Sequence, residues 1–144
     1  MSALDPGRRY LLDTSVFLRA RQESVRASIA AALEGERLLT TPPLIAEMLQ
    51  TARNRREFER LEKMLDALPP ARFPGSLWAV ARDATRALAG RQSGYHRVSI
   101  ADALIAAAAQ ENALGVLHYD HHYDRLAEVL VFESRWIAPA GSLD

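Results

Sequence analysis

Tyr10-Leu11-Leu12-Asp13-Thr14-Ser15 is an apolar run that stops at one acidic residue and two hydroxyl residues. The apolar residues predict a short strand over residues 10–12. Asp, Thr and Ser side chains favour turns and helix starts, so we expect a helix to begin near Ser15. This change from strand to helix is the first unit of a pattern that the rest of the chain repeats.

The alternation of strand and helix continues to the end of the chain. Further strands are predicted over residues 37–40, 116–118 and 135–137, with a brief one at 72–73. Helices are predicted over residues 24–34, from Pro42 onward, and over 55–68, 76–90, 99–112 and 124–129. Such alternation implies parallel pairing, so we expect a three-layer α/β/α domain with a central, mainly parallel sheet.

The segment over residues 99–112 carries the clearest helical signal. Ser99 can cap its start, and apolar residues on nearly every side indicate a buried helix. Gly115 is expected to close the helix in the left-handed conformation that glycine adopts without strain. Residues 55–68 differ, because their apolar positions recur on one face and predict an amphipathic helix.

The composition is that of an ordinary globular protein. Of the 144 residues, 49% are apolar and 25% are charged, and we expect one domain over residues 1–144. The sequence lacks a run of about 18 apolar residues, as a membrane span needs, and residues 1–9 lack the apolar centre of a signal peptide. A cytoplasmic protein is therefore expected. The lack of cysteine excludes a thiol nucleophile and a cysteine zinc site.

The charge balance says little about the substrate. The formal net charge is zero, which argues against a strongly basic nucleic-acid binder. Lys63 is the only lysine among the 18 basic residues, and arginine grips phosphate in a bidentate fork. A GC-rich genome would also explain the many arginines and alanines, so this excess is weak support for a nucleic-acid substrate.

Four acidic residues fall where predicted strands end or predicted helices begin. Asp13 and Asp120 each follow a strand, and Glu47 and Asp102 lie in the early turns of helices. Ligands of an open parallel sheet bind outside the carboxyl ends of its strands, so the four carboxylates can face one crevice. Carboxylates among apolar neighbours need compensation, and Mg²⁺ or Mn²⁺ prefers such oxygen ligands. A bound cation that activates water suits phosphodiester hydrolysis.

Each acid also has a purely structural role open to it. Asp13 can cap the helix that follows, and Asp120 can be a turn residue. Ser99 and Asp102 have the spacing of a capping box. Glu47 has no oppositely charged residue three or four positions away, so a local role is hardest to find for it. The case for a metal site therefore depends on the joint placement of all four.

Five segments in this order resemble PIN-domain nucleases of the VapC toxin type: Leu11-Leu12-Asp13-Thr14-Ser15-Val16-Phe17, Pro43-Leu44-Ile45-Ala46-Glu47-Met48, Asp102-Ala103-Leu104-Ile105-Ala106-Ala107, Val116-Leu117-His118-Tyr119-Asp120 and Trp136-Ile137-Ala138-Pro139-Ala140-Gly141. The resemblance implies a PIN-like fold and an Mg²⁺- or Mn²⁺-dependent endoribonuclease, the toxin of a type II toxin-antitoxin pair. It also implies an RNA substrate, transfer RNA among the candidates, a homodimer and a VapB-type antitoxin as partner.

The same resemblance assigns roles to individual residues. Thr14 or Ser15 matches the hydroxyl residue that supports the first Asp of the family. The primary metal ligands are expected to be Asp13 and Asp102. The acidic quartet, both metal-binding and catalytic, is implied to be Asp13, Glu47, Asp102 and Asp120.

One position departs from the family pattern. Many relatives continue the last acidic motif as Asp-x-Asp-Phe, whereas this chain has Asp120-His121-His122-Tyr123. A fifth acid is then missing unless Asp124 takes its place. His122 is expected to alter metal affinity or the preference for manganese, or to contact phosphate when protonated, or else to be a tolerated surface histidine.

Two other functions remain open. His118, Asp120 and His122 share one side of an extended segment and offer the ligands of a zinc-binding hydrolase. The chain can also be a PIN-fold interaction module with little or no turnover. In that case the exposed part of the helix over residues 58–68 would bind a partner, although its apolar stripe also suits a core or dimer contact.

Overall fold

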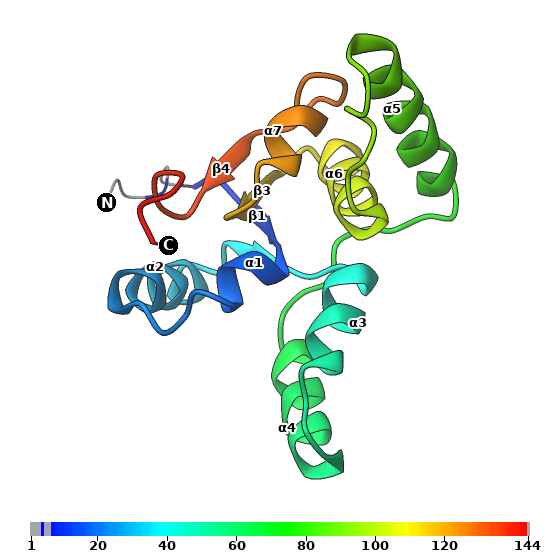
Figure 1. Cartoon of the computed structure of the whole chain (residues 1–144). Coiled ribbons are helices and arrows are strands. Elements are labelled where there is room, and N and C mark those ends of the chain that lie inside the picture. The colour runs from blue at the N-terminus through cyan, green and yellow to red at the C-terminus, as the bar shows by residue number, and fades with distance from the viewer. Residues whose placement is uncertain (1–3, 5–6, 144) are drawn as a thin grey trace.

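A parallel sheet forms the centre of the structure, a computed structural model that describes residue 4 and residues 7–143. Its order is β2 (Leu38–Leu39), β1 (Tyr10–Leu12), β3 (Gly115–His118) and β4 (Ser134–Trp136), and all three pairings are parallel. Leu11 pairs with Leu39 on one side and with Val116 on the other. The predicted parallel sheet is therefore confirmed, and the carboxyl ends of its strands share one edge (Figure 1).

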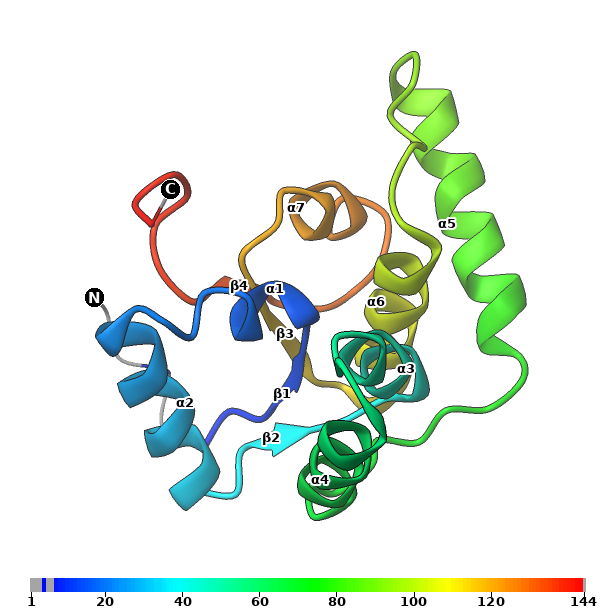
Figure 2. The ribbon, with the colours of Figure 1, turned by 60° about the horizontal axis from the view of Figure 1, so that its bottom comes forward.

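Seven helices within the described residues surround the sheet: α1 (Thr14–Phe17), α2 (Glu23–Glu34), α3 (Pro42–Gln50), α4 (Arg55–Asp66), α5 (Leu77–Arg91), α6 (Ile100–Asn112) and α7 (His122–Leu126). Side chains alternate across β1: Leu11 packs with residues of α5, α6 and α7, whereas Tyr10 and Leu12 pack with residues of α1 to α4. Both faces of the sheet are thus covered, which gives the three layers seen in Figures 1 and 2.

Helix α6 is buried, as its composition predicts. Residues Ala106 to Ala109 have no exposed surface, and α6 packs against α5, α7 and β3. The expected role of Gly115 is wrong, because Ala113 (φ 54°) takes the left-handed position that ends the helix. Gly115 begins β3 instead, and a Cβ there would lie 2.8 Å from the Tyr10 ring.

Two further expectations differ from the structure. Residues 72–73 form no strand: this part of the chain makes only an isolated parallel bridge, between Pro70 and Thr40, which directly follows β2. Helix α7 begins at His122 rather than at 124. The cause is local, because the Asp120 carboxylate accepts a hydrogen bond from the His122 backbone N–H (2.9 Å) and starts the helix early.

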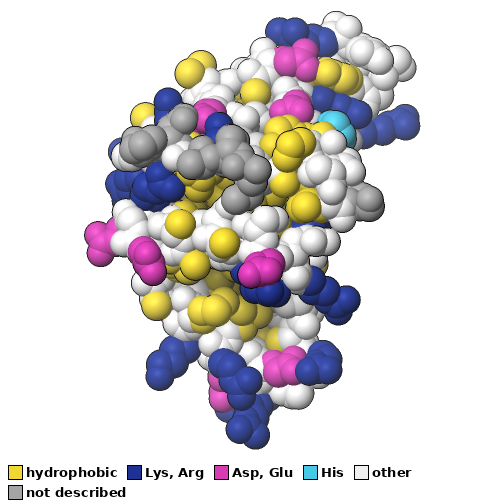
Figure 3. Space-filling view, turned by 90° about the vertical axis from the view of Figure 1, so that its left-hand side faces the viewer, with side chains coloured by type: hydrophobic (Ala, Val, Ile, Leu, Met, Phe, Trp, Pro, Cys, Tyr) yellow, Lys and Arg dark blue, Asp and Glu magenta, His cyan; other side chains and the backbone are white. Residues whose placement is uncertain are grey.

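The α3–α4 hairpin stands away from the sheet as an arm (Figure 1). Its far end carries Lys and Arg side chains beside Asp and Glu (Figure 3), in keeping with ion pairs such as Arg55–Glu59. Phe58 and Met64 are 39% and 50% exposed on α4, so the predicted amphipathic helix leaves apolar surface uncovered. Within the described part of the chain, no helix has the length and apolarity that a membrane span requires.

We expect Gly115→Ala to destabilise the fold by about 1–3 kcal/mol, because the added methyl group would meet the fully buried Tyr10 ring. Gly90→Ala is the matched control: nothing lies within 4 Å of its added Cβ, and alanine favours the helix around it. Urea unfolding measures both. Equal stability of the two variants would contradict the close approach of β3 and Tyr10.

Candidate metal centre

Asp13 lies directly after β1 and is 3% exposed. Its Oδ2 accepts hydrogen bonds from the backbone N–H of Ser15 (3.0 Å) and from the Ser15 hydroxyl (2.5 Å). The same hydroxyl oxygen accepts a hydrogen bond from the backbone N–H of Tyr119 (2.9 Å), just beyond β3. Asp13 is therefore both the cap of α1 and a carboxylate held between the ends of two neighbouring strands.

Tyr123 reaches the same carboxylate from α7. Its fully buried hydroxyl lies 2.7 Å from Asp13 Oδ1 and 3.1 Å from Asp102 Oδ1. The phenol has a single proton to share between the two carboxylates, so it contacts both of them and neutralises neither. Tyr123 is not among the site residues predicted from the sequence. Its only sign in the sequence is that it stands where the family motif ends in Phe, which has no hydroxyl group.

Glu47 completes this group from the second turn of α3. Oxygen atoms of Asp13, Glu47 and Asp102 all lie within 4.8 Å of one another. Glu47 Oε1 is buried and has no hydrogen-bond partner among the described residues. A buried carboxylate oxygen without a donor is costly, and a cation would satisfy it. This donor set of hard oxygen atoms fits a divalent metal ion.

The electrostatics of the group agree with that fit. Burial raises the pKa of Asp102 to about 7, with a further increase from the charge of Asp13, against hydrogen bonds from His122 and Tyr123 that lower it. The pKa of Glu47 is also raised, first by burial and then by the charge of Asp13. The Thr14 hydroxyl has no hydrogen-bond partner among the described residues, whereas the Ser15 hydroxyl donates to Asp13, so Ser15 is the hydroxyl residue that supports Asp13. The carboxylates repel one another unless a proton or a cation intervenes.

Asp120 and His122 form a second group with Asp102. One ligand atom from each lies within 4.8 Å of the others, and Asp102 belongs to both groups. His122 Nδ1 lies 2.9 Å from Asp102 Oδ2 and 3.8 Å from Asp120 Oδ1. All four predicted acids thus meet at one edge of the sheet, and His122 is part of their centre rather than an isolated surface histidine.

The alternative of a capping box at Asp102 is wrong. The Ser99 hydroxyl does accept a hydrogen bond from the Asp102 backbone N–H (3.4 Å), so Ser99 caps α6. A capping box also requires that the Asp102 carboxylate accept a hydrogen bond from the Ser99 backbone N–H. That N–H instead donates to His122 Nδ1 (3.4 Å). The Asp102 carboxylate contacts Tyr123 and His122, so the cap leaves this carboxylate available to the centre.

Asp124 does not replace the missing fifth acid. Its Oδ1 accepts a hydrogen bond from the Ser134 hydroxyl (2.7 Å), and its carboxylate accepts another from Trp136 Nε1. The Ser134 oxygen also lies 2.7 Å from His118 Nε2. Asp124 therefore joins a separate chain of hydrogen bonds behind the acidic centre.

His118 belongs to this separate chain as well. Its Nδ1 accepts a hydrogen bond from the Asp120 backbone N–H (3.1 Å), so both of its ring nitrogens have partners. Burial lowers the pKa of His118 to about 4, which keeps the ring neutral. His118 supports the backbone of Asp120, and the structure does not favour the zinc site that would use His118 together with Asp120 and His122.

The fold and the site together define a class of protein: a parallel α/β/α domain with acidic side chains gathered at the carboxyl edge of the sheet. Comparison with known families agrees, since residues 10–129 match the PIN domain. The chain belongs to the PIN-domain family and is a VapC-type member of it.

Two relatives from Mycobacterium tuberculosis (strain ATCC 25618 / H37Rv) are similar over nearly their full lengths. Ribonuclease VapC51 is 37% identical over 136 residues, which cover 94% of this chain and 98% of the relative. Ribonuclease VapC18 is 32% identical over 135 residues, which cover 93% and 98%.

Solved structures show the same fold. FitAcB from Neisseria gonorrhoeae has a TM-score of 0.60 and 25% identity, and the match covers 85% of this chain and 96% of that one. FitAB bound to an IR36 DNA fragment has a TM-score of 0.62 at 24% identity, covering 86% and 94%. The three-layer fold predicted from sequence is thereby confirmed.

The raised pKa of Asp102 predicts a pH-dependent difference between wild type and Asp102→Asn without metal. The folded carboxyl has a pKa of about 7 against an ordinary 3.8, so its contribution to stability falls as pH rises from about 4 to 7. Asparagine cannot ionise. From pH 5.5 to 8, the free energy of unfolding of the variant should therefore rise by about 2 kcal/mol relative to that of wild type. The lowered pKa of His118 also makes stability depend on pH, but both proteins contain His118, so its effect cancels in the comparison.

Urea unfolding in EDTA at both pH values measures this double difference. A constant offset, such as the loss of hydrogen bonds by Asp102→Asn, does not change with pH and drops out. Parallel pH profiles for the two proteins would show that Asp102 ionises as easily in the fold as in the unfolded chain.

Proposed function

We propose that this chain is a metal-dependent endoribonuclease and the toxin of a type II toxin-antitoxin pair. The observation that carries the proposal is the group of Asp13, Glu47 and Asp102, with oxygen atoms within 4.8 Å of one another and one buried Glu47 oxygen without a donor. Such a group is unfavourable by itself and becomes favourable around a divalent cation. The match to the PIN domain and the names of the VapC relatives support the reaction class.

The residues divide into those that would hold the ion and those that orient them. Asp13 and Asp102 would be the primary ligands, and Glu47 and Asp120 would complete the site directly or through water. Ser15 and Tyr123 fix the two oxygens of Asp13, so this carboxylate cannot rotate away. When bound, Mg²⁺ or Mn²⁺ would lower the pKa of an attacking water and neutralise charge on the leaving oxygen.

RNA is the proposed substrate because the relatives are named ribonucleases, and transfer RNA is the finer proposal from the family resemblance. The proposed partners are a VapB-type antitoxin and a second copy of the chain. The arm formed by α3 and α4 carries exposed apolar side chains, Phe58 and Met64, that are available for such contacts.

Asp13→Asn should lower RNA cleavage by at least about 100-fold in Mg²⁺ or Mn²⁺, because an amide lacks the charge that an ion requires. Cleavage of labelled single-stranded RNA measures this, with EDTA abolishing the activity of wild type. Asp83→Asn, on the exposed surface of α5, is the control and should cleave like wild type. Equal cleavage by Asp13→Asn and wild type would falsify the proposal, and RNA binding without cleavage would favour an interaction module.

His122 should influence the choice of metal. Imidazole favours manganese over magnesium more than a carboxylate does, so His122→Asp should lower the ratio of Mn²⁺ to Mg²⁺ affinity several-fold. Isothermal titration of each ion without RNA measures the ratio. His121→Asp places the same charge one residue away on an exposed side chain and controls for electrostatics alone. If both variants shift the ratio equally, His122 does not contact the ion.

A further inference from the structure

A hollow of about 370 Å³ adjoins the acidic centre at the same edge of the sheet. It shares Ser15 and Asp120 with that centre, so whatever fills it lies directly beside the carboxylates. We call it the aromatic pocket, after the three rings that line it, Tyr119, His121 and Trp136. Leu18 and Arg19 line it as well.

Trp136 is the best-anchored wall of the aromatic pocket. Trp136 is the last residue of β4. Its indole Nε1 donates hydrogen bonds to the two oxygens of the Asp124 carboxylate (3.1 and 3.2 Å). The rings of His121 and Tyr119 meet it edge to face, with centroids 4.9 and 5.3 Å away. An aromatic ring that is already held in place loses little conformational entropy when a ligand stacks on it.

A positive charge lies at the same hollow. The Arg19 guanidinium stacks on the Tyr119 ring, 4.4 Å from its centroid, and the Tyr119 hydroxyl accepts a hydrogen bond from the backbone N–H of Leu143 (3.0 Å). A planar guanidinium pairs well with phosphate oxygens and also stacks on bases. Stacking rings and an arginine beside a centre for phosphodiester chemistry are what a nucleotide requires.

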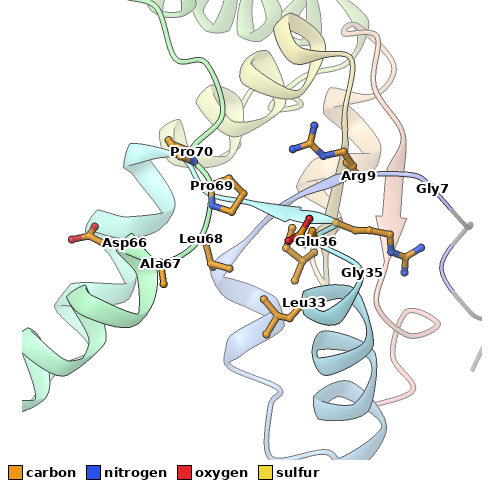
Figure 4. A pocket seen from close by; sticks show the side chains of 12 residues that line it. Gly7, Arg9, Leu33, Gly35, Glu36, Asp66, Ala67, Leu68, Pro69 and Pro70 are labelled. Carbon is orange, nitrogen blue, oxygen red and sulfur yellow. The ribbon is translucent and has the colours of Figure 1, made fainter.

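Two other cavities lack these features. A larger one of about 1040 Å³ lies at the amino ends of β1 and β2, lined by aliphatic side chains and by charges of both signs such as Arg9, Glu36 and Asp66 (Figure 4). Another of about 260 Å³ lies on the α3–α4 arm. Neither is lined by an aromatic ring, and neither shares a residue with the acidic centre.

We propose that the aromatic pocket binds one nucleotide of single-stranded RNA next to the phosphodiester at the acidic centre, with its base stacked on Trp136 and a phosphate near Arg19. This inference rests on the proposed function, because it names where that substrate sits. Stacking accepts any base, so the pocket supplies affinity and position rather than base selection.

The two tryptophans of the chain allow a direct test. Trp78 is 62% exposed on α5 and does not line the pocket. In Trp78→Phe the emission comes from Trp136 alone, and in Trp136→Phe it comes from Trp78 alone. A short single-stranded RNA, titrated in EDTA and again in Ca²⁺, should quench the first protein saturably and leave the second nearly unchanged. Absence of quenching of Trp136 in both conditions overturns the proposal.

Affinity provides the second measurement. By fluorescence anisotropy of labelled RNA, Trp136→Ala should bind about tenfold more weakly than wild type, and Trp136→Phe should stay within about threefold, because it keeps a stacking ring. Circular dichroism and metal titration verify that the fold and the centre persist. Unchanged RNA affinity in Trp136→Ala overturns the proposal.

The outcomes separate this inference from the nuclease proposal. Quenching of Trp136 without cleavage in any divalent metal retains the pocket and removes the nuclease. Metal-dependent cleavage with unchanged affinity in Trp136→Ala retains the nuclease and removes the pocket. If Trp136→Ala instead weakens self-association or antitoxin binding while RNA affinity is unchanged, the hollow is a protein contact and the proposal fails.

Discussion

The central constraint on this structure is a group of mutually repelling carboxylates, which hydrogen bonds from other parts of the fold hold together. Carboxylates of Asp13, Glu47 and Asp102 approach within 4.8 Å in a largely buried position, where repulsion and desolvation act against ionisation. The raised pKa values of Asp102 and Glu47 express that cost. A protein retains such an arrangement when a cation or a reaction compensates for it, and hydrogen bonds hold the carboxylates of Asp13 and Asp102 in place.

Those supports connect the two halves of the site. Ser15 joins Asp13 to the backbone beyond β3, and Tyr123 contacts both Asp102 and Asp13, which lies 110 residues away from it in the sequence. Behind them, hydrogen bonds run from the Asp120 backbone through His118 and Ser134 to Asp124. Asp124 also holds Trp136, so one network positions both an acid of the centre and the main wall of the aromatic pocket.

Sequence reasoning succeeded where the signal was local or topological. The strand over residues 10–12, the buried helix from residue 99 and the parallel pairing follow from apolar runs and their alternation, and all are present. It failed where a distant residue decided the outcome. Gly115 had the position of a helix cap, but it begins β3 in close contact with the Tyr10 ring, and Ala113 is the residue in the left-handed conformation that ends α6.

By itself the sequence determined most of the secondary structure, the parallel pairing and the edge at which four acids would gather, because hydrophobic periodicity and the alternation of strands with helices are properties of the chain. Tertiary structure alone decided what each polar group contacts. It turned the Asp102 carboxylate away from Ser99, the cap of α6, and brought the Tyr123 hydroxyl between two carboxylates. It also placed His122 within the acidic centre and Asp124 outside it. Such contacts join residues far apart in the chain, and only the packing of helices on the sheet sets their distances.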